Sequence, residues 1–355
     1  MTTATAPHTV QRILVRKAGG FDNLELATDA PKPLAPGEVR IAVEAAGVNY
    51  ADAMVRRGLY ATAKKYVGWP ITPGFEVAGR VSELAPGITD LKIGDRVMGL
   101  TLFGGYSSEV TTLRAFVFKT PDAWSSPAAA AFPTVYLTAW FALCELAHPR
   151  PGATILVHSA AGGVGTALAR LGKLMGCTVV GVVGGSHKVA AAKEAGCDHV
   201  IDKSSADLWR EAERISPRGY DVICDANGVE TLGQSYKHLA PVGRLVVYGF
   251  STMIPKTKSG RTNFLKLAWD FLRTPKFAPL DLTNKNRSVM AFNLSDLFTR
   301  KDLLEAGMRD LFAWVDAGQI PAAEPKTYPL AKASEAHRAI ESGTTTGKLV
   351  LLTSP

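Results

Sequence analysis

The stretch HSAAGGVGTALARLGKLMGC, residues 158–177, determines how this chain folds. A short continuous apolar run, ATILV at residues 153–157, precedes it, which is typical of a strand buried on both faces. After the glycines, apolar residues at helical spacing predict a helix over residues 163–175. A helix that begins directly after a buried strand directs its free N–H groups and its positive dipole end at one point. We therefore expect this loop to bind the pyrophosphate of a dinucleotide.

The alternation of strand and helix continues after this loop. Four further strand-like runs follow: TVVGVVG, HVIDK, YDVICDAN and GRLVVYGF. Helical patterns separate them, near residues 188–195, 206–215 and 231–239. This spacing predicts a parallel sheet with helices on both faces, the doubly wound α/β arrangement of Rossmann domains.

The glycine loop matches the dinucleotide-binding pattern G-x-G-x-x-G imperfectly. Ala160 occupies the first glycine position, and Gly162 and Gly165 occupy the other two. A bare backbone lets phosphate oxygens approach closely, and the strand and helix around it support the assignment. The predicted cofactor contacts in this loop are Ala161, Gly162, Gly163 and Val164.

The turn after the next strand favours NADPH over NADH. An acid about 20 residues beyond the loop would bind the ribose 2′-hydroxyl of NAD, but no Asp or Glu occurs between the loop and Glu194. Ser186, His187 and Lys188 stand at that turn, and Lys203 follows the third strand. A hydroxyl and an ammonium group would bind a 2′-phosphate that a carboxylate would repel. The alternative is that Lys188 is an ordinary lysine at the start of a helix.

The segments on either side of this α/β part predict a second, β-rich domain. From Arg12 to about Thr120, alternating runs with frequent Gly and Pro are typical of strands and turns. The tail EPKTYPLAKASEAHRAIESGTTTGKLVLLT predicts a strand, a helix and a strand that return to this domain. We expect residues 1–130 and 321–355 to form the β-rich domain. Residues 131–320 would form the nucleotide-binding domain, with a basic insert at about 251–287.

Composition indicates a globular chain of two domains. It has 355 residues, 46% of them hydrophobic, and a formal net charge of +8. A basic surface can suit nucleic acid, a membrane face or an anionic ligand, or it is simply solvated. Without an arginine-rich tract or an RNA-binding motif we expect no nucleic acid partner. Four isolated cysteines and a start without an apolar stretch favour a reducing, cytoplasmic location. Residues 123–144 carry no charge, but Pro133 divides them, so we expect a buried helix over about 135–147 rather than a membrane span.

Seven segments together resemble those of the medium-chain dehydrogenases/reductases, and most closely their zinc-independent quinone oxidoreductase branch. They are AAGVNYADAMVRRGLY, PGFEVAGRV, GDRVMGL, GGYSSEV, VYLTAWFAL, ATILVHSAAGGVGTALARLGKLMGC and GKLVLL. Residues 263–294 also resemble the synaptic-vesicle membrane protein branch of quinone oxidoreductase-like proteins. The resemblance implies a GroES-like β-rich catalytic domain and NADPH-dependent hydride transfer to quinones or other α,β-unsaturated carbonyls. It also implies a homodimer, for which the edge strand near Ser288–Leu294 is our candidate interface.

The same resemblance implies a site without zinc. Zinc-dependent relatives ligate the metal with a Cys in GVCHTD and a His in GHE, where this chain reads GVNYAD and GFE. Asn49 and Phe75 take those two positions, and neither is a usual zinc ligand. Residues 96–119 contain no cysteine for a structural zinc. Catalysis would then depend on positioning the substrate against the cofactor.

The resemblance places the functional side chains in the cleft between the two domains. Asn49 and Tyr60 are the catalytic candidates, with Asn49 also near the nicotinamide and Tyr60 on the substrate side. Thr138 would contact the nicotinamide end, and Asp52 would orient its loop through backbone N–H groups. The alternatives are a turn-capping role for Asn49, plain packing for Tyr60 and an ordinary helix hydroxyl for Thr138. Three more positions are expected to border the cofactor: Phe250 and Asn293 at the nicotinamide, and Asn227 at the adenosine ribose.

The basic insert leaves several interpretations open. A candidate amphipathic helix at about residues 263–272 could pack on its own protein, serve as a lid or dimer element, lie on an anionic membrane, or bind another partner. The cations of the insert, in and around this helix, are Lys256, Lys258, Arg261, Lys266, Arg273 and Lys276. Two other functions stay open for the whole chain: reduction of an enoyl thioester, and a nucleotide-gated binding or adaptor role at membranes or on RNA.

Overall fold

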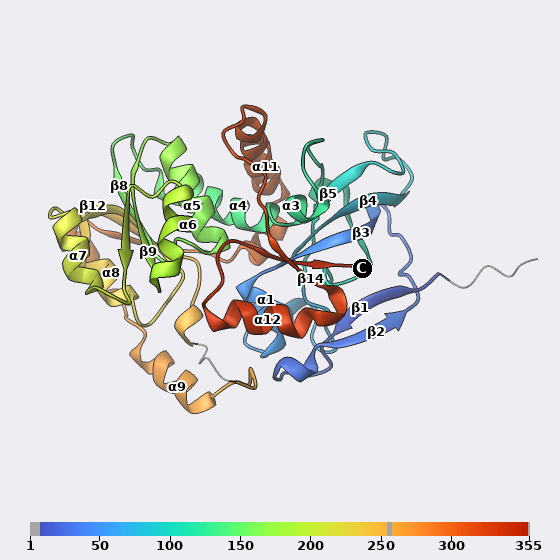
Figure 1. Cartoon of the computed structure of the whole chain (residues 1–355), viewed down its shortest axis with the longest axis horizontal. Coiled ribbons are helices and arrows are strands. Elements are labelled where there is room, and N and C mark those ends of the chain that lie inside the picture. The colour runs from blue at the N-terminus through green and yellow to red at the C-terminus, as the bar shows by residue number, and fades with distance from the viewer. Residues whose placement is uncertain (1–7, 254–257, 354–355) are drawn as a thin grey trace, which may run out of the picture.

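Two sheets lie side by side in the computed structural model, with buried helices between them (Figure 1). The structure describes residues 8–253 and 258–353. Lys256 of the predicted basic insert lies outside the described residues.

A six-stranded parallel sheet forms the nucleotide-binding half, as predicted. Its strands in spatial order are β10 (His199–Asp202), β9 (Thr178–Val183), β8 (Thr154–Val157), β11 (Tyr220–Asp225), β12 (Leu239–Val247) and β13 (Ser288–Ala291). Its helices include α5 (Gly163–Leu174), α6 (Val189–Glu194), α7 (Leu208–Ile215) and α8 (Leu232–Lys237). The chain crosses from one side of β8 to the other after β10. The glycine loop at the carboxyl end of β8 therefore lies at the topological switch point, where folds of this class bind ligands.

Local sequence explains why these elements form. The central strands are rich in Val and Ile and are buried because helices cover both faces of the sheet. Helix α5 buries Ala167, Leu168 and Leu171 on one face, so its apolar stripe faces the core. Helix α7 begins where the Asp207 carboxylate accepts a hydrogen bond from the backbone N–H of Arg210 at 2.8 Å, a standard N-cap.

Both ends of the chain build the second, mostly antiparallel sheet. Its strands in order are β14 (Lys326–Pro329), β15 (Leu349–Leu352), β3 (Glu38–Val48), β4 (Glu76–Leu84), β5 (Arg96–Leu100) and β7 (Val117–Lys119), while β6 (Glu109–Leu113) pairs with β3. Strands β1 (Val10–Leu14) and β2 (Glu25–Asp29) form a separate pair. The predicted tail of strand, helix and strand is present, with α12 (Ala333–Ser342) between β14 and β15. β15 pairs antiparallel with β3, which returns the tail to this sheet.

The β-rich half contains two helices that the strand-and-turn prediction missed. They are α1 (Tyr50–Arg56) and α2 (Ala61–Tyr66). Asp52 stabilises the first turn of α1 because its carboxylate accepts a hydrogen bond from the backbone N–H of Asn49 at 2.8 Å. Each helix has fewer than eight residues, so hydrophobic periodicity over a longer window does not reveal it.

The uncharged segment forms a bent, mostly buried helical run. It comprises α3 (Ser126–Ala130), α4 (Pro133–Trp140) and a π-helical stretch, Phe141–Ala147. The helix thus begins two residues before the predicted start, with Pro133 in its first turn. By length and composition Ser126–Ala147 is the one candidate for a membrane-crossing helix among the described residues, but 72% of its apolar window is buried inside the fold. It serves as a core helix between the two sheets (Figure 1).

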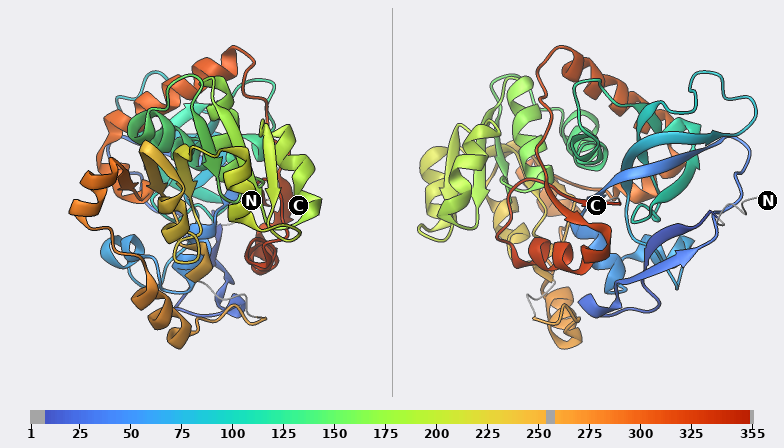
Figure 2. Two further views of the ribbon diagram at one scale, coloured as in Figure 1. Left: turned by 90° about the vertical axis from the view of Figure 1, so that its left-hand side faces the viewer. Right: turned by 45° about the vertical axis from the view of Figure 1, so that its right-hand side comes forward.

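The basic insert leaves the parallel sheet after β12 and returns to it at β13. Its helices are α9 (Phe264–Arg273), close to the predicted range, and α10 (Pro279–Lys285). After β13, which is a strand of four residues at the sheet edge, the chain forms α11 (Lys301–Asp316). Figure 2 shows α9, in orange, projecting at the lower side of the molecule in both views.

Candidate functional site

The glycine loop after β8 brings bare backbone close to a ligand position. Ser159 has a φ of +55°, and Gly162 is the N-cap of α5. A Cβ on Gly165 would lie 2.2 Å from the carbonyl oxygen of Ser159 and 2.7 Å from Cα of Ala160, so only glycine lets the helix begin this close to the strand. A Cβ on Gly162 would meet a single neighbour at 3.3 Å. The helix start is therefore open, and its shape and dipole fit a pyrophosphate.

The C-terminal segment closes over this loop. The backbone N–H of Gly347 donates to the carbonyl oxygen of Ala161 at 2.8 Å. The side chain of Lys348 lies beside the first turn of α5, because a Cβ on Gly163 would be 3.5 Å from Lys348 Cδ. A cationic side chain from the β-rich half thus reaches the nucleotide loop of the other half.

Asn49 belongs to a buried polar cluster with Glu76 and Lys348. Lys348 Nζ donates to Glu76 Oε1 at 2.6 Å and also to Asn49 Oδ1. Asn49 Nδ2 donates to the same Glu76 oxygen at 3.0 Å, and the other Glu76 oxygen accepts from the backbone N–H of Thr134 at 2.8 Å. The amide of Asn49 is therefore held with its carbonyl toward the ammonium group and its NH₂ toward the carboxylate. Asn49 occupies the N-cap position of α1, but these side-chain bonds lead into the cleft, not to the helix.

Asp52 holds the loop that carries Asn49, as expected. Its carboxylate accepts hydrogen bonds from the backbone N–H groups of Asn49 and Gly74, each at 2.8 Å, and from the hydroxyl of Tyr106 at 3.0 Å. Burial raises the pKa of Asp52 to about 7 in spite of these donors. Asp52 is thus a positioning residue beneath the site.

An aromatic cluster fills the space around Phe75. The rings of Phe75 and Tyr60 are 5.7 Å apart, and those of Phe75 and Phe103 are 5.2 Å apart. Phe75 and Phe103 are buried. In the described residues, no three His, Cys, Asp or Glu side chains converge in a way that would hold a metal ion.

Tyr60 connects the two halves of the molecule. Its hydroxyl donates to Asn293 Oδ1 at 2.7 Å and shares a 2.5 Å hydrogen bond with Ser295 Oγ. Burial raises the pKa of Tyr60 to about 12, so the hydroxyl keeps its proton at neutral pH. Tyr60 and Asn293, which the sequence analysis assigned to the same cleft, are in direct contact.

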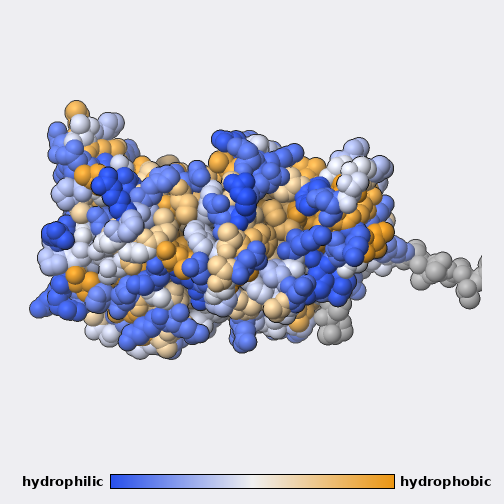
Figure 3. All heavy atoms as spheres, turned by 90° about the horizontal axis from the view of Figure 1, so that it is seen from above, coloured by the Kyte–Doolittle hydropathy of each residue, from blue (hydrophilic) through white to orange (hydrophobic). Residues whose placement is uncertain are grey.

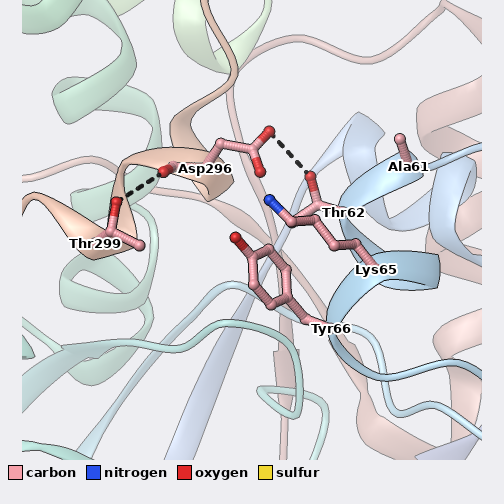
Figure 4. Close-up of a pocket in the computed structure, with 6 residues that line it drawn as sticks. All are labelled: Ala61, Thr62, Lys65, Tyr66, Asp296 and Thr299. Atoms are coloured by element: carbon pink, nitrogen blue, oxygen red, sulfur yellow. Dashed lines mark hydrogen bonds between the residues drawn. The ribbon is translucent and has the colours of Figure 1, made fainter.

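A pocket of about 460 Å³ opens beside this contact (Figure 4). Asp296 reaches from the segment after β13 toward α2, where Thr62 donates to its carboxylate at 3.3 Å. The pocket therefore lies between the two halves. Its lining residues are Ala61, Thr62, Lys65, Tyr66, Asp296 and Thr299.

Thr138 lies on α4 and is mostly buried. Its hydroxyl donates to the carbonyl oxygen of Thr134, four residues earlier, at 2.7 Å. This is the bond of an ordinary helix threonine. The backbone N–H of Thr134 binds Glu76, so α4 still approaches the cluster that holds Asn49.

A carboxylate stands at the turn that was predicted to bind a 2′-phosphate. Ser186 donates to Asp202 at 2.6 Å, and this bond together with those from Ser204 lowers the pKa of Asp202 to about 2. The turn after β9 has no acid of its own, because Asp202 comes from the end of the neighbouring strand β10. Lys188 Nζ donates to the carbonyl oxygen of Gly343 at 2.6 Å, and the side chain of Lys203 passes beside Gly184. The turn therefore combines one acid with the predicted cations.

Asn227 and Phe250 lie in the loops that follow β11 and β12, the strands next to β8 on the side away from β9. Asn227 follows β11, and its Oδ1 accepts a hydrogen bond from the hydroxyl of Ser159 at 3.1 Å. Phe250 is partly exposed and packs on Gly228, where a Cβ would be 2.7 Å from the ring. The structure thus links Asn227 directly to the glycine loop and places Phe250 against Gly228, the residue that follows Asn227.

Sequence reasoning missed four residues of this site: Glu76, Lys348, Asp202 and Ser295. Glu76 lies in GFE and Lys348 in GKLVLL, two segments already used for the family resemblance. The sequence therefore contained a signal for Glu76 and Lys348. It contained none for Asp202 and Ser295, because only the folded chain brings these two residues to Ser186 and Tyr60.

Two family descriptions match this chain. "Alcohol dehydrogenase GroES-like domain" matches residues 35–122, and "Zinc-binding dehydrogenase" matches residues 195–351. The human synaptic vesicle membrane protein VAT-1 homolog is 34% identical over 340 residues, which cover 95% of this chain and 85% of that protein. The chain belongs to the quinone oxidoreductase-like group of the medium-chain dehydrogenase/reductase superfamily. The zebrafish VAT-1 homolog is 32% identical, over 98% of this chain and 71% of its own length.

Solved structures of medium-chain reductases share the fold over nearly their whole length. The Escherichia coli quinone oxidoreductase complexed with NADPH has a TM-score of 0.83 and 28% identity, over 96% of this chain and 99% of that one. The CurK enoyl reductase has a TM-score of 0.83 and 26% identity, over 97% and 99%. The human VAT-1 homolog-like protein has a TM-score of 0.81 and 29% identity, over 98% and 99%. The predicted pairing of a GroES-like domain with a Rossmann-like domain is therefore confirmed.

Proposed function

We propose that this protein is a zinc-independent, NADPH-dependent reductase of quinones and other α,β-unsaturated carbonyls. The observation that carries the proposal is that the open start of α5 and the cluster of Asn49, Glu76 and Lys348 adjoin each other. A nucleotide loop and a preorganised polar site thus face the same cleft. A quinone oxidoreductase of the same fold is known as its complex with NADPH.

The residues present fit NADPH. Ala161 to Val164 and the first turn of α5 would hold the pyrophosphate, with Asn227 near the adenosine ribose. Ser186, Lys188 and Lys203 would hold the 2′-phosphate, with Asp202 opposing them. Bound NADPH supplies the hydride, and the protein contributes orientation and an environment that excludes water.

The residue types at the cleft support a reaction without zinc. Asn49 and Phe75 replace the two ligands of the zinc-dependent relatives, and the rings of Phe75, Tyr60 and Phe103 form an apolar wall. Such a wall suits a flat, electron-poor ring. Tyr60 keeps its proton at neutral pH and can donate a hydrogen bond to oxygen charge that develops on the acceptor.

A second candidate is reduction of an enoyl thioester, which the structural similarity to the CurK enoyl reductase favours. That reaction adds a hydride to one carbon and a proton to its neighbour. Tyr60, which keeps its proton at neutral pH, is our candidate donor of that proton, and its hydroxyl would regain a proton from water. Lys65, at the pocket between the halves, would meet the anionic part of an acyl carrier.

The decisive experiment measures NADPH oxidation by the purified protein with three additions: 9,10-phenanthrenequinone, a crotonyl thioester, and no acceptor. Turnover with the quinone alone supports the first proposal, and turnover with the thioester alone supports the second. Turnover with neither, and with no member of a broader panel of enones, would favour a nucleotide-gated adaptor. Metal analysis of the active protein tests the zinc proposal, which a stoichiometric zinc content would overturn.

We also propose a homodimer through β13. This strand lies at the edge of the parallel sheet, where unpaired backbone groups can extend the sheet into a second copy. Light scattering with a β13 variant, Val289→Pro, tests it. A monomeric wild type would contradict the proposal.

A further inference from the structure

Helix α9 of the insert is turned with its apolar side outward. Its apolar side chains are 59–86% exposed: Phe264, Leu265, Trp269, Phe271 and Leu272. At 100° per residue they cover one continuous arc of the helix. Its charged pair faces the protein instead, since Asp270 is buried and bonded to Lys266. A helix that packed its apolar stripe on its own protein would show the opposite pattern, so the structure contradicts that interpretation of the insert.

The orientation of α9 is fixed before and after the helix. Before it, the insert is bound to the GroES-like domain through backbone carbonyl oxygens. Arg56 donates to the carbonyl of Gly260 and Arg57 to that of Arg261, each at 3.0 Å, and both arginine side chains are fully buried. Lys266 donates to the carbonyl of Thr252 at 3.0 Å, which ties the inner face of α9 to the other half.

After the helix, the chain is held by the Rossmann-like domain. The ring of Phe277 packs on Tyr236 with the centroids 5.2 Å apart. Turning α9 to bury its apolar arc would break the hydrogen bond between Lys266 and Thr252 and would bring the buried Asp270 to the surface. The apolar arc is therefore exposed in the folded molecule, and α9 itself projects from the lower side of the molecule (Figures 1 and 2).

The exposed charged residues of the segment that carries the arc all have one sign. From residue 258 to residue 276 the only acid is Asp270, which is buried. The exposed charged residues in that range are Lys258, Arg261, Arg273 and Lys276. The Arg273 guanidinium lies 5.9 Å from the Trp269 ring, at the border between the apolar arc and the cations.

We propose that α9 docks on an anionic phospholipid bilayer. An apolar arc that includes tryptophan, phenylalanine and leucine, bordered by lysine and arginine, is the pattern of a helix that lies in the membrane interface. The cations would meet the negative headgroups while the apolar side chains enter the acyl boundary. A second copy is the poorer occupant, because a two-fold interface would bring this basic border against itself. The face opposite α9 mixes hydrophilic and hydrophobic residues (Figure 3).

The test is flotation of the full-length protein with vesicles, and it needs no enzyme activity. Wild type should float with phosphatidylcholine vesicles that contain phosphatidylserine and far less with pure phosphatidylcholine. Binding should weaken between about 0.1 M and about 1 M salt, because the electrostatic part is screened. No flotation with the anionic vesicles at the lower salt concentration would overturn the proposal, as would equal, salt-independent binding to both vesicle types.

Variants locate the surface. Leu265→Ser, Trp269→Ser and Leu272→Ser combined should lower the partition coefficient at least about tenfold, and Arg273→Glu with Lys276→Glu should do so for anionic vesicles only. The matched control is Ile93→Ser with Val242→Ser, which removes two equally exposed apolar side chains elsewhere and should leave binding unchanged. Unaltered melting temperatures show that the variants fold. Unchanged binding by the triple variant would overturn the proposal. So would wild-type oligomers that the triple variant abolishes, which would assign the arc to a second copy.

Discussion

Lys348 and Glu76 form a buried ion pair, with 2.6 Å between Nζ and Oε1, at the junction of the two domains. The ammonium group also holds the Asn49 carbonyl, so the pair sets the orientation of the candidate catalytic amide. Lys348 directly precedes β15, the last strand of the GroES-like domain, and lies beside the first turn of α5. The C-terminal return of the chain thus completes both the sheet and the site.

Removing one partner of this pair should destabilise the fold strongly. Lys348→Met leaves Glu76 buried without its cation, and the expected loss is about 3–5 kcal/mol of unfolding free energy. The double variant with Glu76→Gln should lose less than the sum of the single losses. Denaturant unfolding of the wild type, the two single variants and the double variant gives the coupling free energy between Lys348 and Glu76. Lys332→Met, from the exposed pair with Glu335, is the control and should change stability little. Additive losses at Lys348 and Glu76 would show that the pair is not coupled.

The two glycines of the nucleotide loop should respond differently to alanine. In Gly165→Ala the new Cβ meets backbone atoms, which should cost at least about 2 kcal/mol of stability. Gly162→Ala meets a single oxygen at 3.3 Å and should keep its melting temperature. It should still weaken NADPH binding about tenfold, since the methyl group intrudes on the pyrophosphate position. Calorimetric titration with NADPH measures this, and unchanged affinity in Gly162→Ala would place the cofactor elsewhere.

Most of the fold could be predicted from the sequence, because β8 and β9 are continuous apolar runs, typical of strands buried on both faces, and α5 repeats apolar residues at helical spacing. The site was predicted in part. Asn49, Tyr60 and Asn293 were placed in one cleft because their segments resemble a family. The hydrogen bond between Ser186 and Asp202 could not be predicted, because the two residues follow or end different strands. A linear motif does not show which strands are neighbours in the sheet. The orientation of α9 could not be predicted either. Its periodicity indicates an amphipathic helix but does not show which side of the helix faces the protein.

Asp202 should oppose NADPH at the turn that otherwise favours it. Asp202→Asn removes a carboxylate beside Ser186, so we expect NADPH affinity to rise about two- to fivefold, the range for an exposed charge interaction. NADH, which has no 2′-phosphate, should gain little. Lys188→Glu should have the reverse effect and weaken NADPH far more than NADH. Fluorescence titration with both cofactors checks these expectations, and equal effects on the two would show that the turn does not contact the 2′-phosphate.

The Tyr60 hydroxyl should matter for turnover as well as for stability. Tyr60→Phe removes the hydrogen bonds to Asn293 and Ser295 and should cost about 1 kcal/mol of unfolding free energy. If the hydroxyl also stabilises charge on the acceptor, kcat should fall at least about tenfold. Tyr236→Phe is the matched control, because it also removes one tyrosine hydroxyl hydrogen bond, to Asp281, but at a position outside the candidate site, and it should leave kcat unchanged. A Tyr60→Phe enzyme with lower stability and full kcat would limit Tyr60 to joining the two domains.

Asp52 should make stability fall as the pH rises. Its pKa is about 7 in the folded protein, because burial disfavours the charged form, against an ordinary value of 3.8. Between these values the folded state holds a proton that the unfolded state has lost, so the unfolding free energy decreases with increasing pH across that window. The advantage of wild type over Asp52→Asn should therefore shrink, by at most about 4 kcal/mol, from about pH 4 to about pH 8. His337, whose pKa burial lowers, contributes the opposite slope to the stability of both proteins, so the comparison uses the difference between them and not the slope of either alone. Parallel curves for the two proteins across this range would show that Asp52 is ionised throughout, held by Tyr106 and the two backbone N–H groups.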